Sequence, residues 1–194
     1  AACFLLFAVA AAMLDPLCVI LLPIPLSLFF IYSYTKRFTW LCHYVLGVAC
    51  GGAPVGAWMA VTGRIEFPAL FLGAASTLWV AGFDIIYGTQ DVEFDRTHGI
   101  HSIPARFGIP IALAISALSH LGTVFFLTVF GLWMRLGWLY WTGIVLTSFL
   151  LLLEHWLVTP ANLSHVKVAS YNINEIVGPM LFLFTLLDAM LRWF

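Results

Sequence analysis

The sequence predicts an all-α, polytopic transmembrane helical bundle, a conclusion that rests on its composition and on the spacing of its apolar runs. Of the 194 residues, 63% are hydrophobic and only 9% are charged, whereas charged residues make up about a quarter of an ordinary soluble domain. The mean hydropathy is +1.04. Long apolar runs recur between short polar segments, which is typical of helices that cross a lipid bilayer. We therefore expect a single transmembrane domain over residues 1–194.

Seven apolar runs can be followed along the chain. The first, residues 1–14, is shorter than the roughly 20 residues that a spanning helix needs and ends at Asp15-Pro16. It lacks the basic segment and the cleavage site of a signal peptide, so we interpret it as part of a helix that begins upstream. Six longer runs follow, separated by charged or turn-forming residues: 17–34, 39–61, 68–88, 108–133, 136–158 and 171–194.

Because successive loops alternate between the two faces of a membrane, the runs also predict an orientation. Five basic residues fall on one face and three on the other; the five are Lys36, Arg37, Arg96, Arg106 and Lys167. The excess places that face in the cytoplasm, and we expect an integral protein of a bacterial or archaeal cytoplasmic membrane. The net charge of −1 gives no indication of nucleic-acid binding.

The acidic segment at residues 84–95 is the strongest indication of function. It holds four of the nine acidic residues in the chain. In a continuous helix, Asp84, Asp91 and Asp95 would project within roughly 40° of one another. Three carboxylates on one stripe repel each other unless a cation lies among them, and oxygen ligands favour Mg²⁺. The alternative is a helix end whose acidic side chains are simply solvated.

Basic residues of three loops accompany these aspartates, and carboxylate-bound Mg²⁺ with basic side chains is a common way to bind a diphosphate. Lys36, Arg37, Arg96 and Arg106 are the candidate phosphate ligands, although the orientation rule explains part of this charge equally well. Tyr87 would lie about 60° from the acidic stripe, where it would be either a catalytic residue or an interfacial aromatic residue.

Two motifs carry a resemblance to a known family. The stretch from Gly82 to Gly108 contains Asp-x-x-Tyr-x-x-x-Asp-x-x-x-Asp followed by Gly-x-x-Ser-x-Pro-x-x-Phe-Gly. It resembles the second aspartate-rich motif of the UbiA-type intramembrane prenyltransferases, most closely the 4-hydroxybenzoate polyprenyltransferase branch. The stretch from Tyr32 to Ala57 and the aromatic-Asn start of the last run at Tyr171 are also similar to that family.

This resemblance implies a bundle of nine spans, of which about seven are present here. It implies transfer of a polyprenyl group from an allylic polyprenyl diphosphate to an aromatic acceptor, such as a 4-hydroxybenzoate or a dihydroxynaphthoate, in quinone biosynthesis. Mg²⁺ on Asp84, Asp91 and Asp95 would assist departure of the diphosphate, while Ser102 and Asn174 would join the substrate-binding residues. The family's first aspartate-rich motif does not occur in this sequence, so we expect a C-terminal piece of a longer enzyme.

There are three alternatives to this activity. A divalent-cation transporter or channel would also place carboxylates in a bundle, but it would be expected to continue them across the membrane. A CDP-alcohol phosphatidyltransferase would carry Asp-Gly-x-x-Ala-Arg, which the sequence lacks. The third is an inactive fragment of the enzyme, since half of the expected metal site is missing.

Overall fold

The computed structural model describes residues 2–193, and its long helices confirm the all-α transmembrane prediction. Within these residues six helical segments are long and apolar enough to cross a membrane. Five are α4 (Cys42–Thr62), α5 (Phe67–Gly88), α8 (Ile109–Trp133), α9 (Trp138–Leu157) and α10 (Asn174–Trp193), and the sixth is the pair α2 (Pro16–Leu21) and α3 (Pro23–Thr35). The remaining predicted run forms the shorter apolar helix α1 (Ala2–Ala12).

The predicted run 17–34 is interrupted, because α2 ends at Leu21 and α3 begins at Pro23. Proline lacks an N–H group and is tolerated in the first turn of a helix, where no intrahelical partner is needed. The last span differs from the prediction as well. It begins with the π-helical segment η2 (Val168–Ile173), which runs directly into α10.

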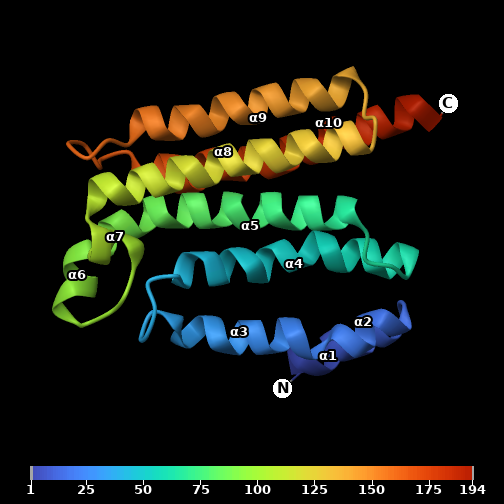
Figure 1. The fold of residues 1–194 in the computed structure, drawn as a ribbon, viewed down its shortest axis with the longest axis horizontal. Helices are drawn as coiled ribbons and strands as arrows, with labels where there is room; N and C mark the ends of the chain where they lie inside the picture. The colour runs from blue at the N-terminus through green and yellow to red at the C-terminus, as the bar shows by residue number, and fades with distance from the viewer. Residues whose placement is uncertain (1, 194) are drawn as a thin grey trace.

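The loops that were predicted to share one face do lie together at one end of the bundle (Figure 1). We call this the polar end; it comprises residues 36–41, 89–108 and 158–167. The longest of these loops follows α5 and forms a lobe of three short helices, η1 (Thr89–Asp91), α6 (Val92–Thr97) and α7 (Ile103–Phe107). The opposite end has only short connections.

Helix α5 lies between α4 and α8 and is the centre of the array (Figure 1). It approaches α4 closely because both helices carry glycine at the contact. A Cβ atom added to Gly51 would lie 2.2 Å from the Thr77 hydroxyl and 2.5 Å from the Gly73 carbonyl oxygen. Small residues that let two backbones approach are a common basis of helix packing in membranes. This contact fixes the position of α5, which carries the acidic segment.

Candidate active site

The acidic segment does not form one continuous α-helix. The α-helix ends at Gly88, and a 3₁₀ turn covering Thr89–Asp91 precedes α6. A 3₁₀ turn has three residues per turn instead of 3.6, so it rotates everything that follows it. Within residues 2–193 no three His, Cys, Asp or Glu side chains are grouped closely enough to hold a metal ion. The three aspartates expected on one stripe are therefore not assembled in this structure.

Asp84 is held by a histidine from the neighbouring helix. The Nδ1 atom of His43, near the start of α4, lies 2.7 Å from Oδ2 of Asp84. His43 is only 1% exposed, and Gly88 leaves room for it, since an added Cβ would lie 3.1 Å from the ring. The carboxylate is thereby fixed in direction, and its second oxygen, Oδ1, makes no hydrogen bond within the described residues.

Asp95 lies inside the lobe that follows α5. It is 2% exposed, and the hydroxyl of Ser102 donates a hydrogen bond of 2.6 Å to its Oδ2 atom. The Ser102 hydroxyl also accepts from the backbone N–H of Ala105, which caps α7. The structure thus gives both residues a role in holding this loop. Metal binding by Asp95 and substrate binding by Ser102 stay predictions.

Asp91 and Tyr87 lie between these two anchored aspartates. Both are partly exposed, and no hydrogen bond to the Asp91 carboxylate occurs among the described residues. The Tyr87 ring packs edge-on against Tyr171 of η2 with 5.3 Å between the ring centroids. Asp84 and Asp91 are therefore two partly exposed carboxylates of the segment with oxygen atoms left to bind a ligand, and Glu93 is a third carboxylate that is exposed. The catalytic role of Tyr87 stays a prediction.

All four candidate phosphate ligands lie at the polar end, in two loops that are bonded to each other. The backbone N–H of His101 donates to the Lys36 carbonyl oxygen over 2.7 Å. Arg37 is exposed and stacks over the ring of Tyr34 at 5.3 Å. The ammonium group of Lys36 and the guanidinium group of Arg37 are thus carried by a loop that touches the lobe after α5.

The other two basic side chains are tied to the lobe itself. The Nε atom of Arg96 donates to the carbonyl oxygen of Ala105 over 3.0 Å. The guanidinium carbon of Arg106 lies 5.9 Å from the ring of Trp40 and 5.5 Å from that of Phe107. Their contact with a phosphate stays a prediction, as it does for Lys36 and Arg37.

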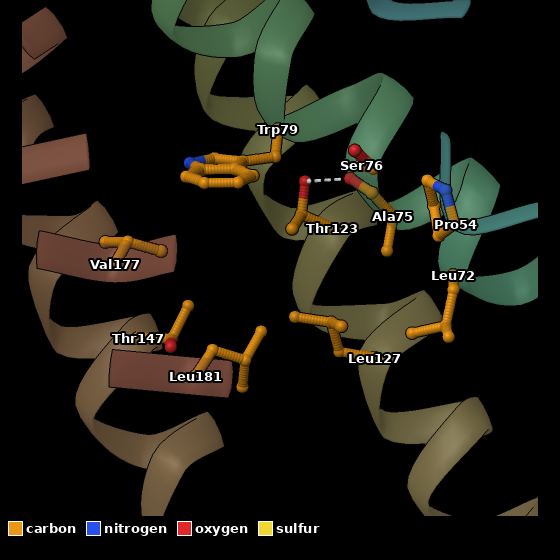
Figure 2. Close-up of a pocket in the computed structure, with 10 residues that line it drawn as sticks. All are labelled: Pro54, Leu72, Ala75, Ser76, Trp79, Thr123, Leu127, Thr147, Val177 and Leu181. Atoms are coloured by element: carbon orange, nitrogen blue, oxygen red, sulfur yellow. Dashed lines mark hydrogen bonds between the residues drawn. The ribbon is translucent and has the colours of Figure 1, made fainter. Parts of the chain in front are cut away.

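An apolar cavity of about 280 Å³ lies inside the bundle. Figure 2 shows ten residues that line it, contributed by five helices: Pro54, Leu72, Ala75, Ser76, Trp79, Thr123, Leu127, Thr147, Val177 and Leu181. Trp79 is the last α5 residue of this lining before Asp84. Five residues of helix separate the two by about 7.5 Å along the axis. Trp79 is also about 140° around the helix from Asp84, so the cavity and the Asp84 carboxylate lie on different faces of α5.

Sequence reasoning missed two residues of this region. His43 pairs with an aspartate 41 positions away, and its only signal was a single histidine in the apolar run 39–61. Trp79 was counted with the bulk of the aromatic residues. Asn174, predicted to bind substrate, instead directs its amide to Glu154 and to the Trp79 indole, and its contact with substrate stays a prediction.

Comparison with known proteins identifies the family of this bundle. Residues 1–176 match the UbiA prenyltransferase family. The chain belongs to this family. It is similar to the 4-hydroxybenzoate octaprenyltransferases of Nitrosospira multiformis, with 31% identity over 83% of the chain and 55% of the relative, and of Vibrio campbellii, with 33% identity over 73% and 50%. The chain thus spans about half the length of these curated relatives.

A solved structure supports the same assignment. The apo structure of a UbiA homolog from Aeropyrum pernix K1 superposes with a TM-score of 0.83 at 31% sequence identity, covering 96% of this chain and 69% of that one. The resemblance inferred from the sequence motifs is confirmed. UbiA prenyltransferases are membrane enzymes, and the six spans of this chain agree with an integral membrane protein.

Proposed function

We propose that the complete protein transfers a polyprenyl group from an allylic polyprenyl diphosphate to an aromatic acceptor in quinone biosynthesis. The relatives named as 4-hydroxybenzoate octaprenyltransferases support an acceptor resembling 4-hydroxybenzoate, and a dihydroxynaphthoate has the same electron-rich ring. The observation that carries the proposal is that α5 lines an almost wholly apolar cavity and carries Asp84 further along the same helix, with Asp91 in the turn that follows. Membership of an enzyme family favours this reaction over a cation transporter or channel.

The aspartate pair fits a hard divalent cation, because its donors are carboxylate oxygens and one oxygen of Asp84 has no hydrogen bond among the described residues. Mg²⁺ is commonly held by one or two carboxylates together with substrate phosphates. Asp84 and Asp91 would therefore hold Mg²⁺, with Asp95 as the third predicted ligand. When bound, the metal neutralises charge on the departing diphosphate.

Different residues around this aspartate pair would bind different parts of the substrate. Lys36, Arg37, Arg96 and Arg106 at the polar end would bind the diphosphate oxygens. The hydrocarbon chain would lie in the apolar cavity, where water is excluded. The bond between the allylic carbon and the diphosphate oxygen breaks, the allylic carbon bonds to the aromatic ring, and the ring loses one proton.

The polar end would face the cytoplasm, where charged diphosphates and aromatic acids are dissolved. The excess of basic side chains at this end supports that orientation. A cysteine introduced in the loop 158–167 would then react with a membrane-impermeant thiol reagent only when the cytoplasmic side is exposed. Labelling from the outer side of intact cells would contradict the orientation.

The reaction can be tested with the complete protein reconstituted in liposomes. Labelled polyprenyl diphosphate is supplied with 4-hydroxybenzoate or a dihydroxynaphthoate, and with MgCl₂ or EDTA. We expect a prenylated aromatic product that requires the divalent cation. Thermal unfolding is used to check that the preparation is folded. If the folded protein forms no prenylated product with either acceptor, the proposal is overturned.

A further inference from the structure

A buried polar group lies among the helices on the far side of α5 from His43. Its centre is Glu154 of α9, which is 0% exposed and lies within a membrane-spanning helix. A carboxylate inside a membrane protein is costly unless it is paired, so its partners indicate its purpose. Its side chain makes contacts with two other helices.

The first contact connects Glu154 to the cavity lining through Asn174. The Nδ2 atom of Asn174, at the start of α10, donates to Oε1 of Glu154 over 2.8 Å. Because the carboxylate accepts, the amide N–H₂ must face Glu154 and the amide oxygen must face away. That oxygen accepts from the indole Nε1 of Trp79. The Nδ2 atom also donates to the backbone carbonyl oxygens of Ala169 and Ser170. Glu154 and this backbone together orient the Asn174 amide, and Asn174 fixes the Trp79 ring.

The second contact, from α8, is looser, and the Oε2 atom of Glu154 makes no hydrogen bond with any described residue. Nδ1 of His120 lies 3.6 Å from Oε2 of Glu154 and 3.0 Å from Nε2 of His155. His120 is 3% exposed and fits against α5 only because residue 82 is glycine, where an added Cβ would lie 2.3 Å from the imidazole. The imidazole beside Glu154 is therefore tightly packed against α5.

Trp79 lies in the wall of the cavity, so the orientation of its ring affects the shape of that wall. It lines the cavity in Figure 2, with its ring nitrogen on the side away from Thr123 and Ser76. Its ring also packs edge-on against Phe83, with 6.0 Å between centroids, and Phe83 directly precedes Asp84. The indole thus contacts both the cavity and Phe83, and it lies about 1.4 turns before Asp84 and about 140° around the helix from it.

We infer that Glu154 and Asn174 are positioning residues that hold the Trp79 indole as a wall at the polar end of the cavity. This inference rests on the proposed function and adds residues for one step of it. An allylic cation formed there has two fates. Attack by the aromatic ring gives the prenylated acceptor and a proton, whereas attack by water gives a prenol and a proton. A fixed indole keeps water from the cation and offers its π-face to the positive charge.

The measurable consequence is the ratio of prenol to prenylated acceptor, which a merely structural defect would leave unchanged while lowering both products. The complete protein in liposomes is assayed for both products after identical consumption of labelled polyprenyl diphosphate. Glu154→Leu removes the side-chain acceptor for Asn174 and leaves its backbone acceptors. Trp79→Phe removes the indole N–H and one of its two rings while keeping a single aromatic ring. We expect each change to raise the ratio about tenfold, the effect of losing a buried hydrogen bond.

Conservative and control variants separate positioning from folding. Glu154→Gln keeps an amide oxygen that accepts from Asn174, so it should stay close to the wild-type ratio. Glu66→Leu is the matched control, because Glu66 accepts from the Trp58 indole over 3.0 Å on an exposed surface at the opposite end. It should leave the ratio unchanged. Should Glu154→Leu not accumulate in membranes, Trp79→Phe carries the test alone.

A double variant, Glu154→Leu with Trp79→Phe, tests whether the two residues act through one contact. If they do, the double variant should have a ratio of prenol to prenylated acceptor close to that of either single variant, because both changes disrupt the same contact. A wild-type ratio in Trp79→Phe, or effects that multiply in the double variant, would overturn the inference. Failure of the wild-type protein to form either product would instead overturn the proposed function.

Discussion

The pairing of His43 with Asp84 gives the sharpest test of the acidic segment. Replacing His43 with leucine removes the donor that fixes the carboxylate over 2.7 Å and leaves a similar apolar volume. A buried hydrogen bond to a charged group contributes about 1.5–3 kcal/mol, and loss of a residue that orients a metal ligand weakens metal binding about 10-fold to 100-fold. We expect a decrease of that size in apparent Mg²⁺ affinity.

Two measurements check this expectation on the complete protein. One is the Mg²⁺ concentration that gives half-maximal turnover, and the other is direct binding of Mn²⁺ followed by electron paramagnetic resonance without substrate. His43→Gln keeps an N–H donor and should lose less affinity. His98→Leu is the control, because His98 is exposed and contacts only its own helix end. Unchanged metal binding in His43→Leu, together with lost activity in Asp84→Asn, would refute the reasoning.

Four further expectations concern single contacts. Asp91→Asn should abolish turnover in the liposome assay without changing the melting temperature; unchanged activity would remove its metal role. Ser102→Ala leaves the buried Asp95 carboxylate without its donor, so thermal unfolding should show a loss of about 1.5–3 kcal/mol. Gly51→Val overpacks the contact with α5 and should cost about 1–3 kcal/mol in the same measurement. Asp188→Ala removes the carboxylate that accepts from the N–H of Gly137, and the loss should be about 0.5–2 kcal/mol, with Asp188→Asn retaining most of the stability.

The membrane-spanning helices could be predicted because their signal is local. Length and hydropathy alone identify a segment such as α8, and alternation of loops places Lys36 and Arg106 at one end. The family was also accessible, since the spacing from Asp84 to Gly108 is a linear motif. None of these inferences needs knowledge of which helix packs against which.

The geometry of the candidate site could not be predicted in the same way. The phase of the acidic segment changes at Thr89, where the 3₁₀ turn begins, and nothing in the local sequence requires that turn. The burial of Asp95 depends on Ser102 folding back over it. Asp188 is 3% exposed and accepts from the N–H groups of Gly137 and Tyr140 at the start of α9. Each of these outcomes depends on a tertiary contact.

Side chains of two other helices hold residues of α5 from different sides. His43 of α4 holds Asp84, while Asn174 of α10 holds Trp79. Both held residues belong to α5, so their separation follows from the rise of an α-helix, about 7.5 Å for five residues. The axial separation of Asp84 and Trp79 is therefore set by α5 itself. Asp91 and Asp95 belong instead to the lobe at residues 89–108, whose shape depends on the separate contact of Asp95 with Ser102.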